Sequence, residues 1–276
     1  MMAKNVLLWF PLSAAVLMPA TFLVTYAWSV GLGHVEPDFP YISATGTYPP
    51  ESCFFGLMLN IIAILLLVTV WVRHRQIEDH CSQTVVAYNL PRTSEVASVF
   101  GYAAAFGICL VGNFQATNVA SVHLIGAGMA FGLGNIYLWI QSWMSVHLMP
   151  RVNSKAVTVV RFVSSAIATL MIILTILFSF LYDAKNRDVA YWTEETEWWM
   201  DDERQHWEFH IIATASEWVL AAAFVVVLLS LVPEFKRMTF QGVMVEYDRD
   251  RDQLRERSHP PTQSSETINT IESERL

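Results

Sequence analysis

Charge is scarce in this sequence, and the scarcity excludes an ordinary soluble domain. Only 15% of the 276 residues are Asp, Glu, Lys or Arg, and 54% are hydrophobic, whereas soluble domains carry about 25% charged residues. The shortage is concentrated in long stretches with almost no charge. A run of about 20 apolar residues is enough to cross the hydrocarbon core of a bilayer. The composition therefore predicts an all-α polytopic membrane protein.

Several functional signatures are also missing. The three cysteines lie in different segments, so we expect no disulfide framework. No Asn-X-Ser/Thr sequence is present to mark a lumenal face by glycosylation. The sequence also lacks a zinc-binding helix, a nucleophile elbow and a kinase or Walker signature. We therefore expect no enzyme, with no catalytic residues, no metal and no cofactor, and no nucleic-acid partner.

Six apolar runs are long enough to be transmembrane helices, at about residues 6–30, 53–72, 96–116, 120–146, 156–181 and 210–231. The first run is longer than the 7–15-residue core of a signal peptide, so we interpret it as an uncleaved span. Beyond Pro233 the chain is rich in charge, Ser and Thr, which is typical of disorder. The sequence thus predicts a six-span domain, 1–232, and a disordered cytosolic tail, 233–276.

Basic residues near the span ends predict the orientation, because short cytosolic loops carry an excess of Lys and Arg. With the N-terminus in the cytosol, eight bases fall on the inside face and three on the outside face. We therefore expect both termini in the cytosol. The inside bases are Lys4, Arg73, Arg75, Arg92, Arg151, Lys155, Lys236 and Arg237, and the outside bases are Lys185, Arg187 and Arg204.

The first exoplasmic loop, which leads into the second span, is rich in proline and glycine and contains no base over residues 38–60. Prolines fix φ and glycines permit tight turns, so we expect this loop to pack over the helix ends. A structural lid is the favoured interpretation, and a ligand-binding loop is the alternative. The other long exoplasmic loop, about 182–210, is acidic and rich in tryptophan, which suits the headgroup layer.

Ionisable and amide side chains inside the predicted spans are candidate functional residues, because burying them in lipid is costly. Five of them fall in the outer third of the bilayer by their depth along the helices. We predict that they form one polar cluster, either a sensing or ligand site or interhelical hydrogen bonds. These residues are Asn60, Asn113, Gln115, His123 and Glu217.

A second set of side chains is suited to lipid headgroups. Four bases near the cytosolic span ends favour anionic lipids, and two tryptophans of the acidic loop suit the interface. They are Arg73, Arg75, Lys236 and Arg237, with Trp198 and Trp199. We expect Arg161 to reach the cytosolic headgroups in the same way. Gly128 and Gly132, spaced four apart, predict a close approach of the third and fourth spans.

The order of several motifs resembles the damage-regulated autophagy modulator (DRAM) family. These motifs are "FPYISATGTYPPESCFFGLMLN", "WVRHRQ", "GNFQATN" with His123, "GLGNIYLWIQ" and "ASEW". The resemblance covers about residues 1–240, and the first-loop motif is most similar to the second-modulator branch. Ala44 stands where the family usually has an acidic residue, and no lysosomal sorting signal is recognisable in the tail.

The resemblance implies a non-enzymatic multi-pass protein of the lysosomal membrane that promotes autophagy and has links to cell death. It defines no catalytic residues. The implied partners are the lipid bilayer and cytosolic autophagy or lipid-kinase machinery, and the endosomal or plasma membrane is the alternative location. Three functions stay open beside it: a transporter built around Glu217, a lipid-organising protein, and a plasma-membrane regulator of a phosphoinositide kinase.

Overall fold

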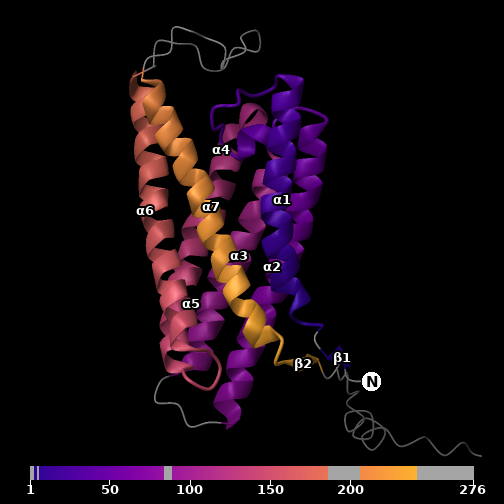
Figure 1. Cartoon of the computed structure of the whole chain (residues 1–276), viewed down its shortest axis with the longest axis vertical. Coiled ribbons are helices and arrows are strands. Elements are labelled where there is room, and N and C mark those ends of the chain that lie inside the picture. Colours follow the sequence, from indigo (N-terminus) through magenta and orange to yellow (C-terminus); the bar gives the residue numbers. More distant parts are fainter. Residues whose placement is uncertain (1–2, 5, 84–88, 186–205, 241–276) are drawn as a thin grey trace, which may run out of the picture. The chain divides into compact units, whose positions relative to one another are not determined.

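The computed structural model describes residues 3–4, 6–83, 89–185 and 206–240 (Figure 1). Residues 3–240 form one compact unit, in which six helices are long and apolar enough to cross a membrane. The predicted all-α polytopic fold is therefore confirmed. The strands among the described residues are two short ones, β1 (Ala3–Lys4) and β2 (Thr239–Phe240), which pair antiparallel. The predicted disordered tail lies almost wholly outside the described residues.

The helices extend beyond most of the predicted spans. They are α1 (Trp9–Leu32), α2 (Glu51–Gln83), α3 (Leu90–Asn113), α4 (Ala116–Ala127), α5 (Gly134–His147), α6 (Lys155–Lys185) and α7 (Trp207–Phe235). A span predicted from hydropathy stops where the apolar residues stop. The helix itself can continue into polar residues, because its backbone hydrogen bonds are still satisfied. In α2, pairs one turn apart such as Arg75–Glu78 and Asp79–Gln83 support this polar extension.

The fourth span is irregular. It consists of α4, a π-helical segment η2 (Gly128–Leu133), and α5, and Val119 inside α4 has non-helical dihedral angles. The predicted close approach at Gly128 and Gly132 is wrong, because a methyl group on either would find no atom within 4 Å. The α3–α4 contact lies at Gly107 instead, where such a group would be 2.6 Å from the carbonyl oxygen of Gly126.

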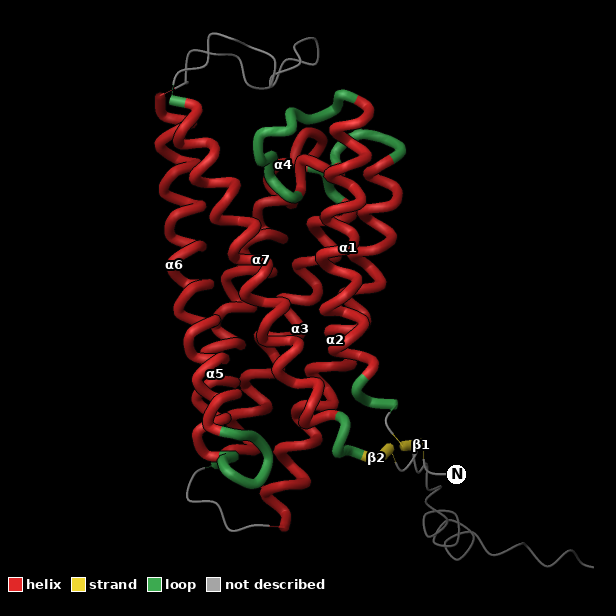
Figure 2. Tube along the Cα trace, in the orientation of Figure 1, coloured by secondary structure: helices red, strands yellow, loops and turns green. Residues whose placement is uncertain are grey.

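The helices are arranged with their connections at two ends (Figures 1 and 2). One end, here called the loop end, carries residues 33–50 and the turn between α3 and α4. The other, called the terminal end, carries β1, β2 and the connection 148–154. Neighbouring pairs are α1 with α2 and α7, α2 with α3, α3 with α4, and α6 with α7. Large apolar side chains on the outward faces, such as Ile64 and Ile176, are exposed as a bilayer requires.

Candidate functional site

The first loop is hydrogen-bonded to α6 and α7, the last two helices of the chain. The indole Nε1 of Trp218 donates a hydrogen bond to the Pro40 carbonyl oxygen at 2.9 Å. The Ile42 N–H donates to Oε2 of Glu217 at 2.8 Å, and the Tyr41 hydroxyl bonds Ser179 Oγ at 2.6 Å. Three consecutive loop residues are thereby held on α7 and α6.

The same loop is also held on α1 and α2. A short 3₁₀ turn, η1 (Ser43–Gly46), places the Thr45 hydroxyl 2.8 Å from that of Thr25. His34 Nδ1 lies 2.6 Å from Oε1 of the buried Glu51. The prediction that the loop packs over the helix ends is therefore confirmed, and the loop is called the cap below (residues 33–50).

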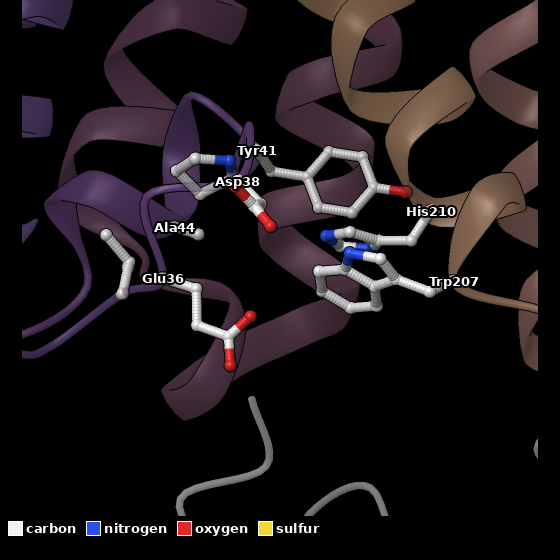
Figure 3. A pocket seen from close by; sticks show the side chains of 8 residues that line it. Glu36, Asp38, Tyr41, Ala44, Trp207 and His210 are labelled. Atoms are coloured by element: carbon white, nitrogen blue, oxygen red, sulfur yellow. The ribbon is translucent and has the colours of Figure 1, made fainter. Parts of the chain in front are cut away.

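A small notch lies between the cap and α7, as shown in Figure 3. Glu36, Asp38 and Tyr41 line it from the cap, and Trp207 and His210 line it from α7. The Trp207 and His210 rings stack at 4.3 Å between centroids, and Tyr41 meets His210 edge-on. Burial is the main cause that raises the pKa of the Tyr41 hydroxyl, which therefore stays neutral. With a volume of about 20 Å³, the notch has room for about one water molecule.

A larger cavity, of about 80 Å³, lies beneath the cap. It is partly open and is lined by the cap and by α1, α2, α3, α4, η2 and α7, and its walls are mainly apolar. Its ionisable lining groups are His123 and Glu217, both of which are buried. The other lining residues are Met18, Phe22, Ile42, Ser43, Phe55, Leu59, Ile108, Val111, Ala127, Ala130, Phe131, Ala221 and Phe224.

The structure divides the five residues of the predicted polar cluster into separate groups. Glu217 and His123 share the cavity, whereas Asn60 and Asn113 bond each other, with amide N–O distances of 2.9 and 3.3 Å. Gln115 accepts a hydrogen bond from Asn118 at 3.2 Å. The prediction from depth therefore placed these residues at the correct end of the helices, but they do not form one site.

At the terminal end, three charged side chains form a buried ionic cluster (Arg73, Arg161 and Glu234). Arg73 Nη1 donates to Oε2 of Glu234, and Arg161 Nη2 donates to Oε1 at 2.6 Å. The side chains of both arginines are 0% exposed and that of Glu234 is 3% exposed. This cluster joins α2, α6 and α7.

Polar side chains of α2, α5 and α7 surround the ionic cluster. Gln141 and Gln76 accept from Arg73 at 3.0 and 2.6 Å. Ser145 Oγ accepts from Arg161 at 2.7 Å, and Ser230 accepts from it through both its hydroxyl and its carbonyl. Because the cluster buries two positive charges with one negative charge, removal of Glu234 leaves like charges facing each other in the interior.

The ionic cluster corrects two sequence-based predictions. Arg73 was predicted to contact lipid headgroups, and Arg161 to reach them from its helix. Both are fully buried and bonded to Glu234, so neither side chain is available to lipid. Sequence reasoning missed Glu234 because it follows Pro233, where the change in composition indicated the start of the tail.

The other predicted headgroup contacts differ in their exposure. The Arg75 side chain is 62% exposed, and it bonds Glu78 and lies over the Trp71 ring. Lys236 and Arg237 are exposed just beyond α7. Trp198 and Trp199 lie outside the described residues. Of the four bases predicted to contact headgroups, Arg75, Lys236 and Arg237 are thus exposed.

Comparison with known proteins supports the same assignment as the first-loop motif. The sequence model for the Frag1/DRAM/Sfk1/Cwh43P N-terminal domain matches residues 6–238, which include all six long helices. The chain belongs to the Frag1/DRAM family. This confirms the family that the first-loop motif predicted. No solved structure matches this family member.

Named relatives of this family member include three autophagy modulators. Rat DNA damage-regulated autophagy modulator protein 2 is 32% identical over 80% of this chain and 81% of its own length. Human DNA damage-regulated autophagy modulator protein 1 is 32% identical over 80% of this chain and 88% of its own. Xenopus laevis modulator of macroautophagy TMEM150B-B is 37% identical over 54% of this chain and 63% of its own.

Proposed function

We propose that this protein is a multi-pass modulator of autophagy that acts without catalysis in the lysosomal or endosomal membrane, with links to cell death. The observation that carries the proposal is the similarity to two named modulators over 80% of the chain. It is supported by the family match, which extends over the cap, the cavity and the ionic cluster. A regulator of this kind needs a stable membrane scaffold with surfaces for partners, and the six-helix bundle supplies one.

The proposed orientation places the terminal end in the cytosol and the cap in the lumen. Both described ends of the compact unit meet in the β1–β2 pair, as an even number of spans requires. The exposed bases Arg75, Lys236 and Arg237 then face the anionic cytosolic leaflet, where a base contributes about 1 kcal/mol to membrane attraction. Through these bases, the terminal end is suited to contact lipid or cytosolic autophagy and lipid-kinase machinery.

The test is rescue of autophagic flux in cells that lack the protein. Flux is measured as the turnover of a lipid-conjugated autophagosome marker with and without lysosomal inhibition, and location is measured by imaging against lysosomal and surface markers. Wild-type protein is expected to restore autophagic flux and to be located in lysosomal membranes. Unchanged flux on removal and on rescue contradicts the proposed function, and a purely surface location contradicts the proposed compartment.

The role of the exposed bases is tested by a variant with Arg75→Gln, Lys236→Gln and Arg237→Gln. We expect this variant to reach the membrane normally and to restore less flux than wild type. Lys185→Gln, which removes an exposed base from the lumenal end of α6, is the matched control and is expected to restore flux fully. Full rescue by the triple variant contradicts a contact through these bases.

A further inference from the structure

The cavity beneath the cap presents an incompletely bonded carboxylate. Oε2 of Glu217 accepts the Ile42 N–H at 2.8 Å, but Oε1 has no hydrogen-bond partner among the described residues. The side chain is only 9% exposed and it lines the cavity. The lining of the cavity therefore contains an unused acceptor of hydrogen bonds.

The second ionisable group of the cavity is also an acceptor in its neutral form. His123 Nδ1 lies 2.7 Å from the Phe114 carbonyl oxygen. Because a carbonyl oxygen only accepts, Nδ1 carries the hydrogen, and Nε2 of the neutral ring keeps its lone pair. No partner for Nε2 lies among the described residues. A molecule bound in this cavity therefore has to supply donors.

Charge defines the ligand further. The described residues that line the cavity include no Lys or Arg, and no described base forms an ion pair with Glu217. A carboxylate taken out of water without a counter-charge is unfavourable, and an ammonium group would compensate it while donating up to three hydrogen bonds. A phosphate would find no basic partner here, so the lining disfavours phospholipid headgroups.

The remaining walls suit hydrocarbon. Phe131 of η2 and Phe224 of α7 both line the cavity and meet edge-to-face, with ring centroids 6.1 Å apart. Leu124 and Ile125 of α4, the helix that also contributes His123 to the cavity, are exposed. A volume of about 80 Å³ holds a head group and its first carbons, so the rest of an alkyl chain has to continue into the bilayer.

We propose that the cavity beneath the cap binds the ammonium head of a single-chain amphiphilic amine drawn from the bilayer, with Glu217 as its counter-charge. His123 accepts a further hydrogen bond, and Phe131 and Phe224 flank the alkyl chain. This proposal goes beyond the autophagy role and does not depend on it, because it concerns binding by the purified protein.

The experiment is photolabelling of the full-length protein in nanodiscs with an 18-carbon primary amine that carries a diazirine and an alkyne. We expect saturable labelling that unlabelled octadecylamine competes away, and that octadecanol and phosphatidylethanolamine compete away at least about tenfold less well. Peptide mapping is expected to place the label on α4, η2 or α7 around the cavity. Non-saturable labelling, equal competition by the alcohol, or a label elsewhere overturns the proposal.

Variants separate charge from packing. Glu217→Gln keeps the shape and an acceptor for the Ile42 N–H but removes the charge, and it is expected to weaken amine labelling at least about tenfold. Asp183→Asn, a matched change at an exposed residue of α6, is expected to leave labelling unchanged. Undiminished labelling of a monodisperse Glu217→Gln protein overturns the proposal. If that variant does not fold, Ala221→Leu, which fills the cavity, supplies the same test: lost labelling supports the site and retained labelling overturns it.

Discussion

Helix α7 carries two buried glutamates, Glu234 at its terminal end and Glu217 in its loop-end half, and the two are used in opposite ways. At the terminal end, both oxygens of Glu234 are bonded to arginines of other helices. At the loop end, one oxygen of Glu217 holds the backbone of the cap and the other faces a cavity. A glutamate thus joins three helices through ion pairs at one end, whereas at the other end a glutamate keeps one carboxylate oxygen without a hydrogen-bond partner among the described residues.

The difference lies in what each carboxylate is bonded to. The Glu234 partners are side chains rooted in α2 and α6, so the ionic cluster ties three helices together. The Glu217 partner is a single N–H of a connecting segment, and removing it costs one hydrogen bond rather than a charge network. We therefore expect the terminal end to contribute more to folding stability, and the loop end to be the part that can respond to a ligand.

Removal of the carboxylate at the terminal end is expected to have the largest effect. Glu234→Ala leaves Arg73 and Arg161 buried together without a counter-charge, and breaking such a pair costs about 3–5 kcal/mol. The free energy of unfolding in mixed micelles measures the loss. A cost below about 1 kcal/mol would show that the ionic cluster does not hold the helices together.

The matched change at the loop end is expected to cost less. Glu217→Ala leaves the buried Ile42 N–H without an acceptor, at about 1–3 kcal/mol. The same unfolding measurement compares it with Glu234→Ala, and Glu217→Gln is the control because its side-chain oxygen still accepts the bond. If Glu217→Ala is as costly as Glu234→Ala, the contrast between the two ends is wrong.

The smallest effect is expected at Asn60 and Asn113, whose reciprocal bonds lie at the loop end but outside the cavity. Interhelical hydrogen bonds in membrane proteins contribute about 0.6 kcal/mol on average. A double-mutant cycle with Asn60→Ala and Asn113→Ala measures the coupling. A coupling energy above about 2 kcal/mol would make this pair, and not the cap, the main stabilising feature of the loop end.

Much of the fold could be predicted from the sequence, because hydropathy and length define a membrane helix with little help from its neighbours. The cap was also predictable, since prolines, glycines and missing bases are local properties of residues 38–60. Depth along a helix is local as well, and it correctly assigned Asn60, Asn113, His123 and Glu217 to one end.

Helix facing could not be predicted, and the errors follow from this. Arg73 and Arg161 were expected at headgroups because their depth permits it, but their helices turn them toward Glu234. Spacing alone favoured Gly128 and Gly132 as contact points, whereas the π-helical segment leaves them without a neighbour and Gly107 makes the contact. A partner on another helix leaves no signal in the sequence spacing of either residue.

The most direct test of the contrast between the two ends is hydrogen exchange of the full-length protein in nanodiscs, compared for Glu217→Ala and Glu234→Ala. We predict that Glu217→Ala accelerates exchange in peptides of the cap, including the Ile42 amide, and leaves the segments around Arg73 and Arg161 protected. Glu234→Ala is predicted to accelerate exchange at the terminal end and to spare the cap. Equal protection of the cap in wild type and Glu217→Ala, or the same exchange pattern in both variants, would contradict the account.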